Sequence, residues 1–472
     1  MYSFPISKLG AWTALPVLAA AGLIGSAQGQ AHFAPAPIQG TTWRFPQPVN
    51  LAPPLIIEHP CPSDKAFFGE SLVFFDYTGD GLDDLAVGAF GEGRVYCFPN
   101  GDPGGSTAFF HSFSVVDREG PTTCQGPLRD DKFGYDVTAA NLDDDPAEEL
   151  IVGAFEATVN GIAGAGRVYI YPDVDSAPVV LEAPILEAGW FGRSVEAGDF
   201  DGDGFMDVAV AATHGKVNGV QGGRVYVFFK PLYPDRSVLI LDNPNPSPFG
   251  TFGHHLAVGN VDGVGADDLY VSGIGNTVNN IPFAGEVYHY PPPISAGTYN
   301  VFRDPIPNSQ DLPAIRYSMH LHAGGNILAL GANRKDWNGV KDTGVAYVHR
   351  TPSLNPVLLS HPTPQVNDLF GYRVAVGHFL GTRNLDVAIL TLPVNSNPNP
   401  REVMIWEGGM IHGEPMLRFT VEPDSQDHFP NGLDVGQIRP GGKQELGLGD
   451  RSWDHPSLPG NNDAGRAVIY FF

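Results

Sequence analysis

The sequence is poor in charged residues, and basic residues are the scarcer of the two signs. Charged side chains make up 17% of the 472 residues, with 27 Lys and Arg against 52 Asp and Glu, so the formal net charge is −25. A protein that binds nucleic acid needs a basic face for the phosphates, and this balance argues against such a partner. An acidic surface of this kind keeps an exported protein soluble, and attraction of a specific cationic ligand is the alternative.

Cysteine is also scarce, and the chain contains only Cys61, Cys97 and Cys124. An odd number leaves at least one thiol unpaired or joined to another molecule, and the sequence does not decide which two would form a disulfide. The spacing matches no zinc motif, so we expect these cysteines to be structural.

Long apolar runs are missing except near the N-terminus, between about Ala11 and Gly25. Small residues at 27 and 29 follow this run, and the pattern predicts a secretory signal peptide over residues 1–29. A membrane anchor is the alternative, but the run is short and contains Pro16. We therefore expect a secreted protein, extracellular or in the cell envelope, with no membrane span and with an extended lead-in at 30–52.

Glycine, proline and aromatic residues, by contrast, are abundant. The chain has 58 Gly and 43 Pro, and aromatic residues make up 11% of it. Many turn residues between short apolar segments are typical of an all-β protein.

A unit of about 60 residues recurs seven times along the chain. Each copy begins with an aromatic residue, usually followed by Gly, and these aromatics stand 53 to 65 residues apart: Phe68, Phe133, Phe191, Phe252, Tyr317, Phe370 and Phe429. Each unit holds four short apolar segments, the first of which begins at the aromatic, and "LAVGAF" and "GRVYCF" are the second and third of the first copy. This period and this number of segments predict a β-propeller of seven four-stranded blades.

The two ends of the repeated region complement each other. The last copy stops after "AVIYFF" with no room for a fourth strand, whereas the extra segment "PPLIIEHP" (53–60) precedes the first copy. We predict that this segment pairs with the last strand and closes one propeller domain over residues 53–472.

An acidic loop starts eight residues after the aromatic in most copies, and the third reads "DFDGDGFMD" (199–207). An EF-hand would need Glu at the twelfth position, where Val210 stands, so we predict a shorter calcium loop between two strands. Glycines at the fourth and sixth positions of loops one and three permit the sharp turn. The predicted oxygen ligands are Asp76, Thr78, Asp80, Leu82 and Asp84 in loop one, Asn141, Asp143, Asp145, Ala147 and Glu149 in loop two, and Asp199, Asp201, Asp203, Phe205 and Asp207 in loop three, with Leu82, Ala147 and Phe205 acting through their carbonyls.

The other loops have lost some or all of these ligands. The loop at 260–268 keeps Asn260, Asp262 and Asp268 but has Val264 at the fifth position, and the fifth copy replaces its loop by a Gly-Gly-Asn turn. We therefore predict two to three Ca²⁺ ions with a structural role, since an acidic turn without a cation would suffer repulsion among its carboxylates.

These residues resemble the FG-GAP repeat, as found in the β-propeller of integrin α chains. The resemblance covers nearly the whole region from 53 to 472, and the "GAP" element is written "GAF" in the first two copies. It implies a secreted module for cell adhesion that binds a protein or a glycan. A secreted enzyme that cleaves polysaccharide or phosphoester is the rival hypothesis, and a purely structural envelope protein is a third. We expect a monomer.

Motifs for catalysis are absent, since the sequence contains no G-x-S-x-G, H-E-x-x-H or phosphate-binding glycine loop. We therefore predict no catalytic residue, although a buried carboxylate pair near the propeller channel would favour the rival enzyme. Strand alternation predicts that His254 and His255 point to opposite faces, and that His320 and His322 share a face without a third metal ligand.

The connections between the second and third strands also repeat a motif, at 158–162, 216–220, 277–281 and 336–340. Asn-Gly or Asn-Asn at their centres predicts tight turns more strongly than a ring of ligand contacts. The last such connection is the longest, and its Trp453, Asp454 and His455 offer an aromatic beside polar groups.

Overall fold

The computed structural model describes fourteen stretches of the chain, all of them within the compact unit Pro46–Phe472. They are residues 51–99, 111–113, 131–143, 145–172, 176–233, 236–247, 250–305, 320–351, 353–394, 399–408, 413–421, 430–440, 443–459 and 462–472. The predicted signal peptide, the lead-in up to residue 50, Cys124, Tyr317 and Phe429 lie outside the described residues.

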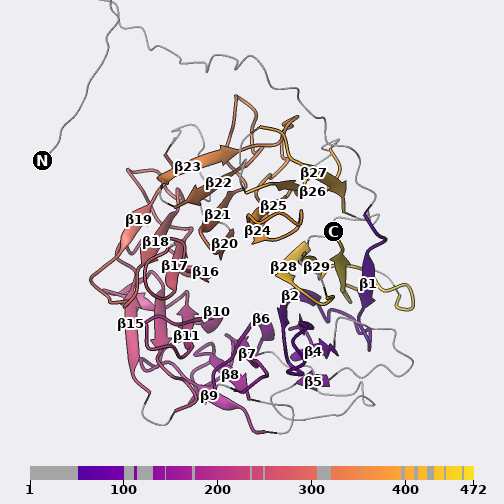
Figure 1. Ribbon diagram of the computed structural model, residues 1–472. Helices are drawn as coiled ribbons and strands as arrows, with labels where there is room; N and C mark the ends of the chain where they lie inside the picture. The colour runs from indigo at the N-terminus through magenta and orange to yellow at the C-terminus, as the bar shows by residue number, and fades with distance from the viewer. Residues whose placement is uncertain are drawn as a thin grey trace, which may run out of the picture. The chain divides into compact units, whose positions relative to one another are not determined.

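The described unit consists of seven four-stranded antiparallel sheets arranged in a ring around a central channel (Figure 1). The all-β, seven-bladed prediction is therefore confirmed. The innermost strands are β2 (Phe68–Phe75), β6 (Phe133–Ala140), β10 (Phe191–Gly198), β16 (Phe252–Gly259), β20 (His320–Gly324), β24 (Arg373–Gly377) and β28 (Pro430–Gly436). The second strands are β3 (Asp84–Ala89), β7 (Glu149–Ala154), β11 (Asp207–Ala212), β17 (Asp268–Gly273), β21 (Ile327–Ala332), β25 (Asp386–Leu390) and β29 (Glu445–Asp450).

The third and fourth strands lie farther from the channel. The third strands are β4 (Arg94–Phe98), β8 (Arg167–Tyr171), β14 (Arg224–Phe228), β18 (Glu286–Tyr290), β22 (Val345–Arg350), β26 (Glu402–Trp406) and β30 (Arg466–Tyr470). The outermost strands are β5 (His111–Phe113), β9 (Val179–Leu181), β15 (Val238–Asp242), β19 (Asn300–Phe302), β23 (Ser353–Leu359), β27 (Leu417–Thr420) and, in blade seven, β1 (Leu55–Glu58). A separate two-stranded hairpin, β12 (Lys216–Val217) and β13 (Val220–Gln221), extends from blade three.

Strand β1 closes the ring as the chain ends predicted. It pairs antiparallel with β30, with Leu55 opposite Ile469 and Ile57 opposite Ala467. Blade seven therefore combines three strands from one end of the propeller sequence with one strand from the other.

The Phe-Gly element has a physical reason in the way each blade begins. Phe191 is fully buried and packs edge-on against Tyr226 of the third strand, at 5.6 Å between ring centroids. Gly192 follows at φ +87°, and the register of β10 against β11 shifts at this point. A Cβ on Gly192 would lie 2.5 Å from the Arg167 carbonyl oxygen of the preceding blade, so only glycine fits.

The apolar core lies between the blades. Seven clusters of buried side chains each join one blade to the next, and the cluster between blades seven and one includes Ile57 of β1. Each blade therefore needs both neighbours to bury its faces.

The described residues contain no helix that is long and apolar enough to cross a membrane. Cys61 is disulfide-bonded, whereas Cys97 is a free thiol buried in the core, and burial raises its pKa well above the ordinary value.

Candidate functional site

Loop three connects β10 to β11 and brings together three of its four predicted carboxylates. Oxygens of Asp199, Asp201 and Asp207 lie within 4.8 Å of one another. Burial and the nearby acids Asp201 and Asp203 raise the pKa of Asp207 to about 7. Asp203 instead pairs with the ammonium group of Lys230, at 2.5 Å. The trio forms an acidic pocket that suits a hard cation.

Loop two connects β6 to β7 and gathers Asp143, Asp145 and Glu149 in the same way. Glu149 is fully buried, and burial together with the two aspartates raises its pKa to about 7. Its Oε2 accepts the N–H of Leu142, while its Oε1 is buried without a hydrogen-bond partner. A buried acceptor oxygen without a hydrogen bond is unfavourable, and a bound cation would supply the partner that it lacks.

Loop one, between β2 and β3, uses its acids differently. The Asp76 carboxylate accepts the N–H groups of Asp80 at 3.0 Å and Gly81 at 2.7 Å, and Asp84 accepts that of Thr78 at 2.9 Å. Its three predicted aspartate ligands, all within the described part of the chain, do not form a trio as close as those of loops two and three. Loop one therefore matches the calcium-loop pattern in sequence, but its carboxylates lie farther apart than those of loops two and three.

Loop four, between β16 and β17, gathers an unexpected set. Asp262 and Asp268 lie within 4.8 Å of His289, which comes from the third strand β18. The His289 Nε2 contacts Asp268 Oδ1 at 2.7 Å, and its ring stacks on Tyr270 at 4.8 Å. Nothing in the sequence of the loop itself signals this histidine.

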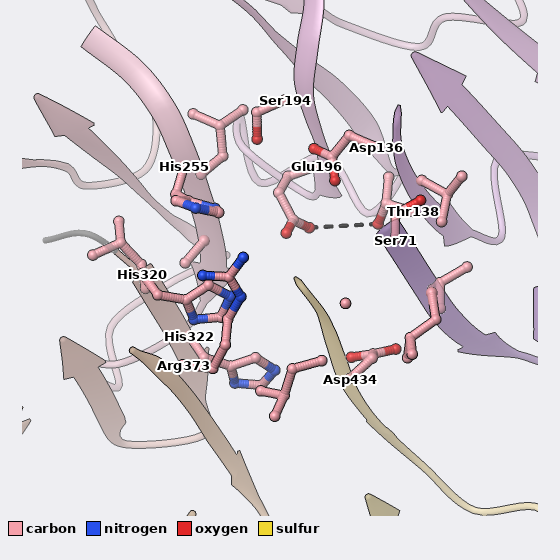
Figure 2. A pocket seen from close by; sticks show the side chains of 18 of the residues that line it. Ser71, Asp136, Thr138, Ser194, Glu196, His255, His320, His322, Arg373 and Asp434 are labelled. Carbon is pink, nitrogen blue, oxygen red and sulfur yellow. Dashed lines mark hydrogen bonds between the residues drawn. The ribbon is translucent and has the colours of Figure 1, made fainter. Parts of the chain in front are cut away.

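The central channel is lined by two rings of side chains from the innermost strands (Figure 2). Counting the Phe of Phe-Gly, or its counterpart, as one, the rings are formed by positions four and six of each strand. Among the polar members are Ser71, Asp136, Ser194, His255, His320 and Arg373 at position four, and Thr138, Glu196, His322 and Asp434 at position six. The cavity measures about 360 Å³. Within these two rings, carboxylates come from blades two, three and seven, and histidines and Arg373 come from blades four to six. Glu70 of blade one, Arg193 of blade three and Arg451 of blade seven also line the cavity, so both signs of charge stand on the side that carries the carboxylates.

Burial controls the protonation of both walls. It raises the pKa of Asp136 to about 6 and that of Asp434 to about 7. Burial and these two carboxylates raise the pKa of Glu196 well above its ordinary value. On the other wall, burial lowers the pKa of His322 to about 4.

Four of these channel side chains accept hydrogen bonds from the next blade. Asp136 accepts the N–H of Val195 at 3.0 Å, and Asp434 accepts that of Phe74 at 2.8 Å. His320 Nδ1 accepts the N–H of Val374 at 3.4 Å, and His322 Nδ1 accepts that of Val376 at 3.2 Å. We call these four contacts seam bonds. In each seam bond, a side chain at position four or six accepts the N–H of the residue at position five or seven of the next blade. These N–H groups are available because an innermost strand is a sheet edge.

The seam bonds show why His320 and His322 do not form a metal site. Because His320 and His322 accept through Nδ1, their neutral rings carry the proton on Nε2 and offer no free lone pair to a metal. The expectation for His254 and His255 is wrong: both line the channel, because a register shift between Phe252 and Leu256 interrupts the strand alternation.

The four Asn-containing connections are tight hairpins, as predicted. Asn160 and Gly161 both have positive φ, as do Asn218 and Gly219, and the flanking residues pair across each turn. We call the face that carries these hairpins the hairpin face and the opposite one, with the acidic loops, the acid-loop face. Strand direction alternates within each blade, so the connections between blades also lie on the hairpin face.

A row of aromatic rings crosses blades one to three on the hairpin face. The successive members are Phe67, Phe90, Tyr135, Phe155, Trp190 and His214, with centroid distances between neighbours of 3.7 to 5.3 Å. We call this set the aromatic row. The Arg193 guanidinium lies 4.1 Å from the Tyr135 ring centroid. Phe90 and Phe155 are buried, whereas the Trp190 ring stays partly exposed.

A polar depression adjoins the exposed end of the aromatic row. Asp131, Glu156, Thr158, Gly164 and Trp190 line it. It combines an indole face with two carboxylates and a hydroxyl, a combination that suits sugars and basic side chains. The repeat pattern does not indicate this site, and the one signal in the sequence is Trp190, which stands directly before Phe191 as a second aromatic at the start of copy three.

The aromatic cluster that the sequence singled out does not form such a site. Trp453 is only 8% exposed, and the Asp454 carboxylate accepts the N–H groups of Asn462 and Asp463. His455 lies 3.3 Å from Glu58 of β1. These residues close their own loop.

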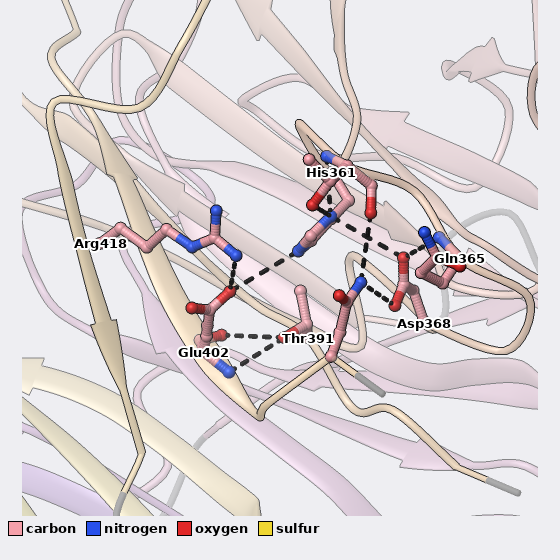
Figure 3. Close-up of polar contacts among 8 residues, drawn as sticks. His361, Gln365, Asp368, Thr391, Glu402 and Arg418 are labelled. Atoms are coloured by element: carbon pink, nitrogen blue, oxygen red, sulfur yellow. Dashed lines mark hydrogen bonds and ion pairs between the residues drawn. The ribbon is translucent and has the colours of Figure 1, made fainter. Parts of the chain in front are cut away.

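A polar cluster in blade six places a histidine between two acids (Figure 3). His361 lies between Asp368, at 3.8 Å, and Glu402, at 3.6 Å. Burial alone would raise the pKa of Glu402, but His361 and Arg418 hold it below its ordinary value. The side chains of His361 and Asp368 are completely buried, so the cluster fastens the connection before blade six to β26 and meets no substrate.

Comparison with known proteins agrees with the repeat. Residues 191–228 match the model of the FG-GAP repeat. The chain is 30% identical over 173 residues to integrin alpha-5 of Xenopus laevis and 33% identical over 157 residues to integrin alpha-IIb of Mus musculus. These matches cover 35% and 30% of this chain but only 15% of either integrin chain.

One similar protein is an enzyme by name. Phosphatidylinositol-glycan-specific phospholipase D of Dictyostelium discoideum is 23% identical over 187 residues, which is 36% of this chain and 20% of that protein. The matches and the seven blades together confirm the predicted resemblance to the FG-GAP propeller of integrin α chains.

Proposed function

We propose that this chain is a secreted, calcium-stabilised FG-GAP propeller that binds a protein or glycan ligand on its hairpin face as a monomer. The observation that carries the proposal is the aromatic row with the adjoining polar depression. Loops on a rigid scaffold are common binding sites, and a partly exposed tryptophan beside carboxylates gives both contact area and orientation.

The acidic loops have a supporting role in this proposal. Loops two and three would hold Ca²⁺ through their gathered carboxylates, with the Ala147 and Phe205 carbonyls as further ligands, and loop one would provide a third site. The bound cation would neutralise carboxylates that now repel one another, and so stabilise the turn between two strands.

The integrin relatives support a binding role, but the matched part is a small fraction of their length, and their partners are not transferred to this chain. The rival function, cleavage of polysaccharide or phosphoester, has two observations in its favour: the carboxylates of the channel and the phospholipase D relative. Asp136 and Asp434 already serve the next blade as hydrogen-bond acceptors. Glu70, a fourth carboxylate of the cavity, pairs with Arg451 at 2.7 Å. These contacts account for three of the four carboxylates without catalysis, and we favour binding.

The test is binding to arrays of immobilised glycans and purified extracellular proteins, with calcium and with a chelator. We expect Trp190→Ala to weaken binding about 10- to 30-fold, as loss of a central aromatic contact usually does. Tyr233→Ala is the control, because Tyr233 is an exposed aromatic on the acid-loop face, next to Phe205.

Equal loss of binding in both variants would contradict the proposed face. Release of sugar or phosphate from an array component by the wild type, and its loss in Glu196→Gln, would establish the rival function instead.

A further inference from the structure

The seam between blades five and six depends on two histidines, unlike the other seams with seam bonds. Asp136 and Asp434 can accept an N–H whether or not they carry a proton, because a protonated carboxyl keeps its carbonyl oxygen. The Nδ1 of a histidine accepts only while the ring is neutral, since an imidazolium is a donor at both nitrogens. His320 and His322 therefore hold Val374 and Val376 only in one protonation state.

The surroundings of these rings keep them neutral. His255 of β16 lies 4.8 Å from His320 between ring centroids, and Arg373 of β24 also faces His320. His254 of β16 adds to the same side, and β21 contributes no titratable side chain. The carboxylates Glu196 and Asp434 line the opposite wall of the channel (Figure 2). Among the described residues, no carboxylate forms an ion pair with either ring, so no neighbouring acid stabilises an imidazolium.

Protonation would remove both acceptors from the same edge. The N–H groups of Val374 and Val376 lie two residues apart on β24, and each has a seam bond to β20. A charged His320 would also face Arg373 and His255 at short range, which adds repulsion across the same seam. The parallel bridge between Gly344 and Phe370 joins the two blades elsewhere and involves no titratable group.

We propose that the channel side of the seam between blades five and six is an acid-sensitive latch, which protonation of His320 and His322 releases while the other seam bonds hold. Burial lowers the pKa of both rings, so the latch stays closed at neutral pH. Histidines freed by opening regain an ordinary pKa near 6.5, and opening is therefore favoured as the pH falls from about 6.5 towards about 4.

The test is hydrogen exchange measured amide by amide on the full chain between pH 7 and pH 4.5, expressed as protection relative to the unfolded peptide. For each histidine that takes up a proton on opening, protection of Val374 and Val376 should fall about tenfold per pH unit within this window. Val195 and Phe74 are internal controls, because their seam bonds end on Asp136 and Asp434, and their protection should not fall in parallel.

Variants separate the latch from general acid sensitivity. The double variant His320→Gln with His322→Gln keeps an acceptor oxygen that does not titrate, and protection of Val374 and Val376 should become independent of pH. His255→Gln removes a channel histidine without a seam bond and should leave the acid response in place.

Unchanged protection of Val374 and Val376 in the wild type down to pH 4.5 would overturn the proposal. A parallel loss at Val195 and Phe74 would also overturn it, and this comparison needs no variant to fold.

Discussion

At the scale of single residues, the ninth position of the acidic loops has two roles. A carboxylate stands there, at the first residue of the second strand, in six of the seven blades: Asp84, Glu149, Asp207, Asp268, Asp386 and Glu445. In each, it accepts a backbone N–H from the second or third residue of its loop. Loops six and seven keep this acid although they lack the other predicted ligands. A carboxylate at this position therefore stabilises the turn in every one of these loops. It becomes part of a candidate cation site only where the same loop contains further acidic residues.

This double role can be separated by one substitution in each of two loops. We expect Asp207→Asn in loop three to lose a calcium-dependent stabilisation of about 2–3 kcal/mol, which is the stabilisation that a ligand gives at a concentration about 100 times its Kd. Asp386→Asn in loop six is the control, because its loop has no companion acids, and it should change stability equally with and without calcium. Thermal unfolding with Ca²⁺ and with chelator measures both. A wild type whose Tm ignores calcium would refute the cation assignment.

At the scale of elements, the innermost strands show what the sequence could and could not predict. Blade number, strand order and the acidic loops follow from the repeat, because aromatic, glycine and acidic positions recur at fixed spacing. The side chains that line the channel could not be predicted, because the register shift after Phe-Gly breaks the alternation that assigns side chains to faces. The aromatic row could not be predicted for another reason: its members come from three blades, and a second aromatic at the start of a copy, such as Trp190, does not show which rings of other copies it meets.

The charge of the channel leads to a prediction for pH dependence. Burial raises the pKa of Asp434 from about 3.8 to about 7, so the folded state disfavours its charged form, and the cost is largest above pH 7. Asp434→Asn keeps an acceptor for the N–H of Phe74 without the charge. We expect it to stabilise the protein at pH 8, on the order of 2 kcal/mol, since one pKa unit corresponds to about 1.4 kcal/mol.

The gain should shrink as the pH falls below about 7 and vanish below about pH 3.8, where the wild-type carboxyl is neutral in both the folded and the unfolded chain. Denaturant unfolding at several pH values measures this difference. Ser71→Ala, which changes an uncharged member of the same rings, should show no such dependence of stability on pH. A destabilised Asp434→Asn protein at pH 8 would mean that the charge itself is needed in the channel.

At the scale of the whole molecule, stability depends on closure of the ring by β1. The side chain of Ile57 is completely buried in the cluster between blades seven and one, while that of its neighbour Ile56 is 41% exposed. We expect Ile57→Ala to cost about 2–5 kcal/mol, as buried large-to-small substitutions do, and Ile56→Ala to cost less than about 1 kcal/mol. Chemical unfolding of the two variants measures this difference, and similar values would mean that β1 contributes little to the ring.

The pairing of β1 with β30 also determines the order in which the molecule can be completed. Ile57 and its partner Ala467 are 410 residues apart (467 minus 57). During synthesis at about 5–20 residues per second, β1 leaves the ribosome roughly 20 to 80 seconds before its partner strand exists. Throughout that interval the first blade lacks its neighbour across the closing seam, and an exposed strand edge of this kind invites pairing with another chain. The pairing of β1 with β30 thus protects the blade edges of the finished ring, but it leaves the nascent chain exposed to pairing with other chains until the last blade is made.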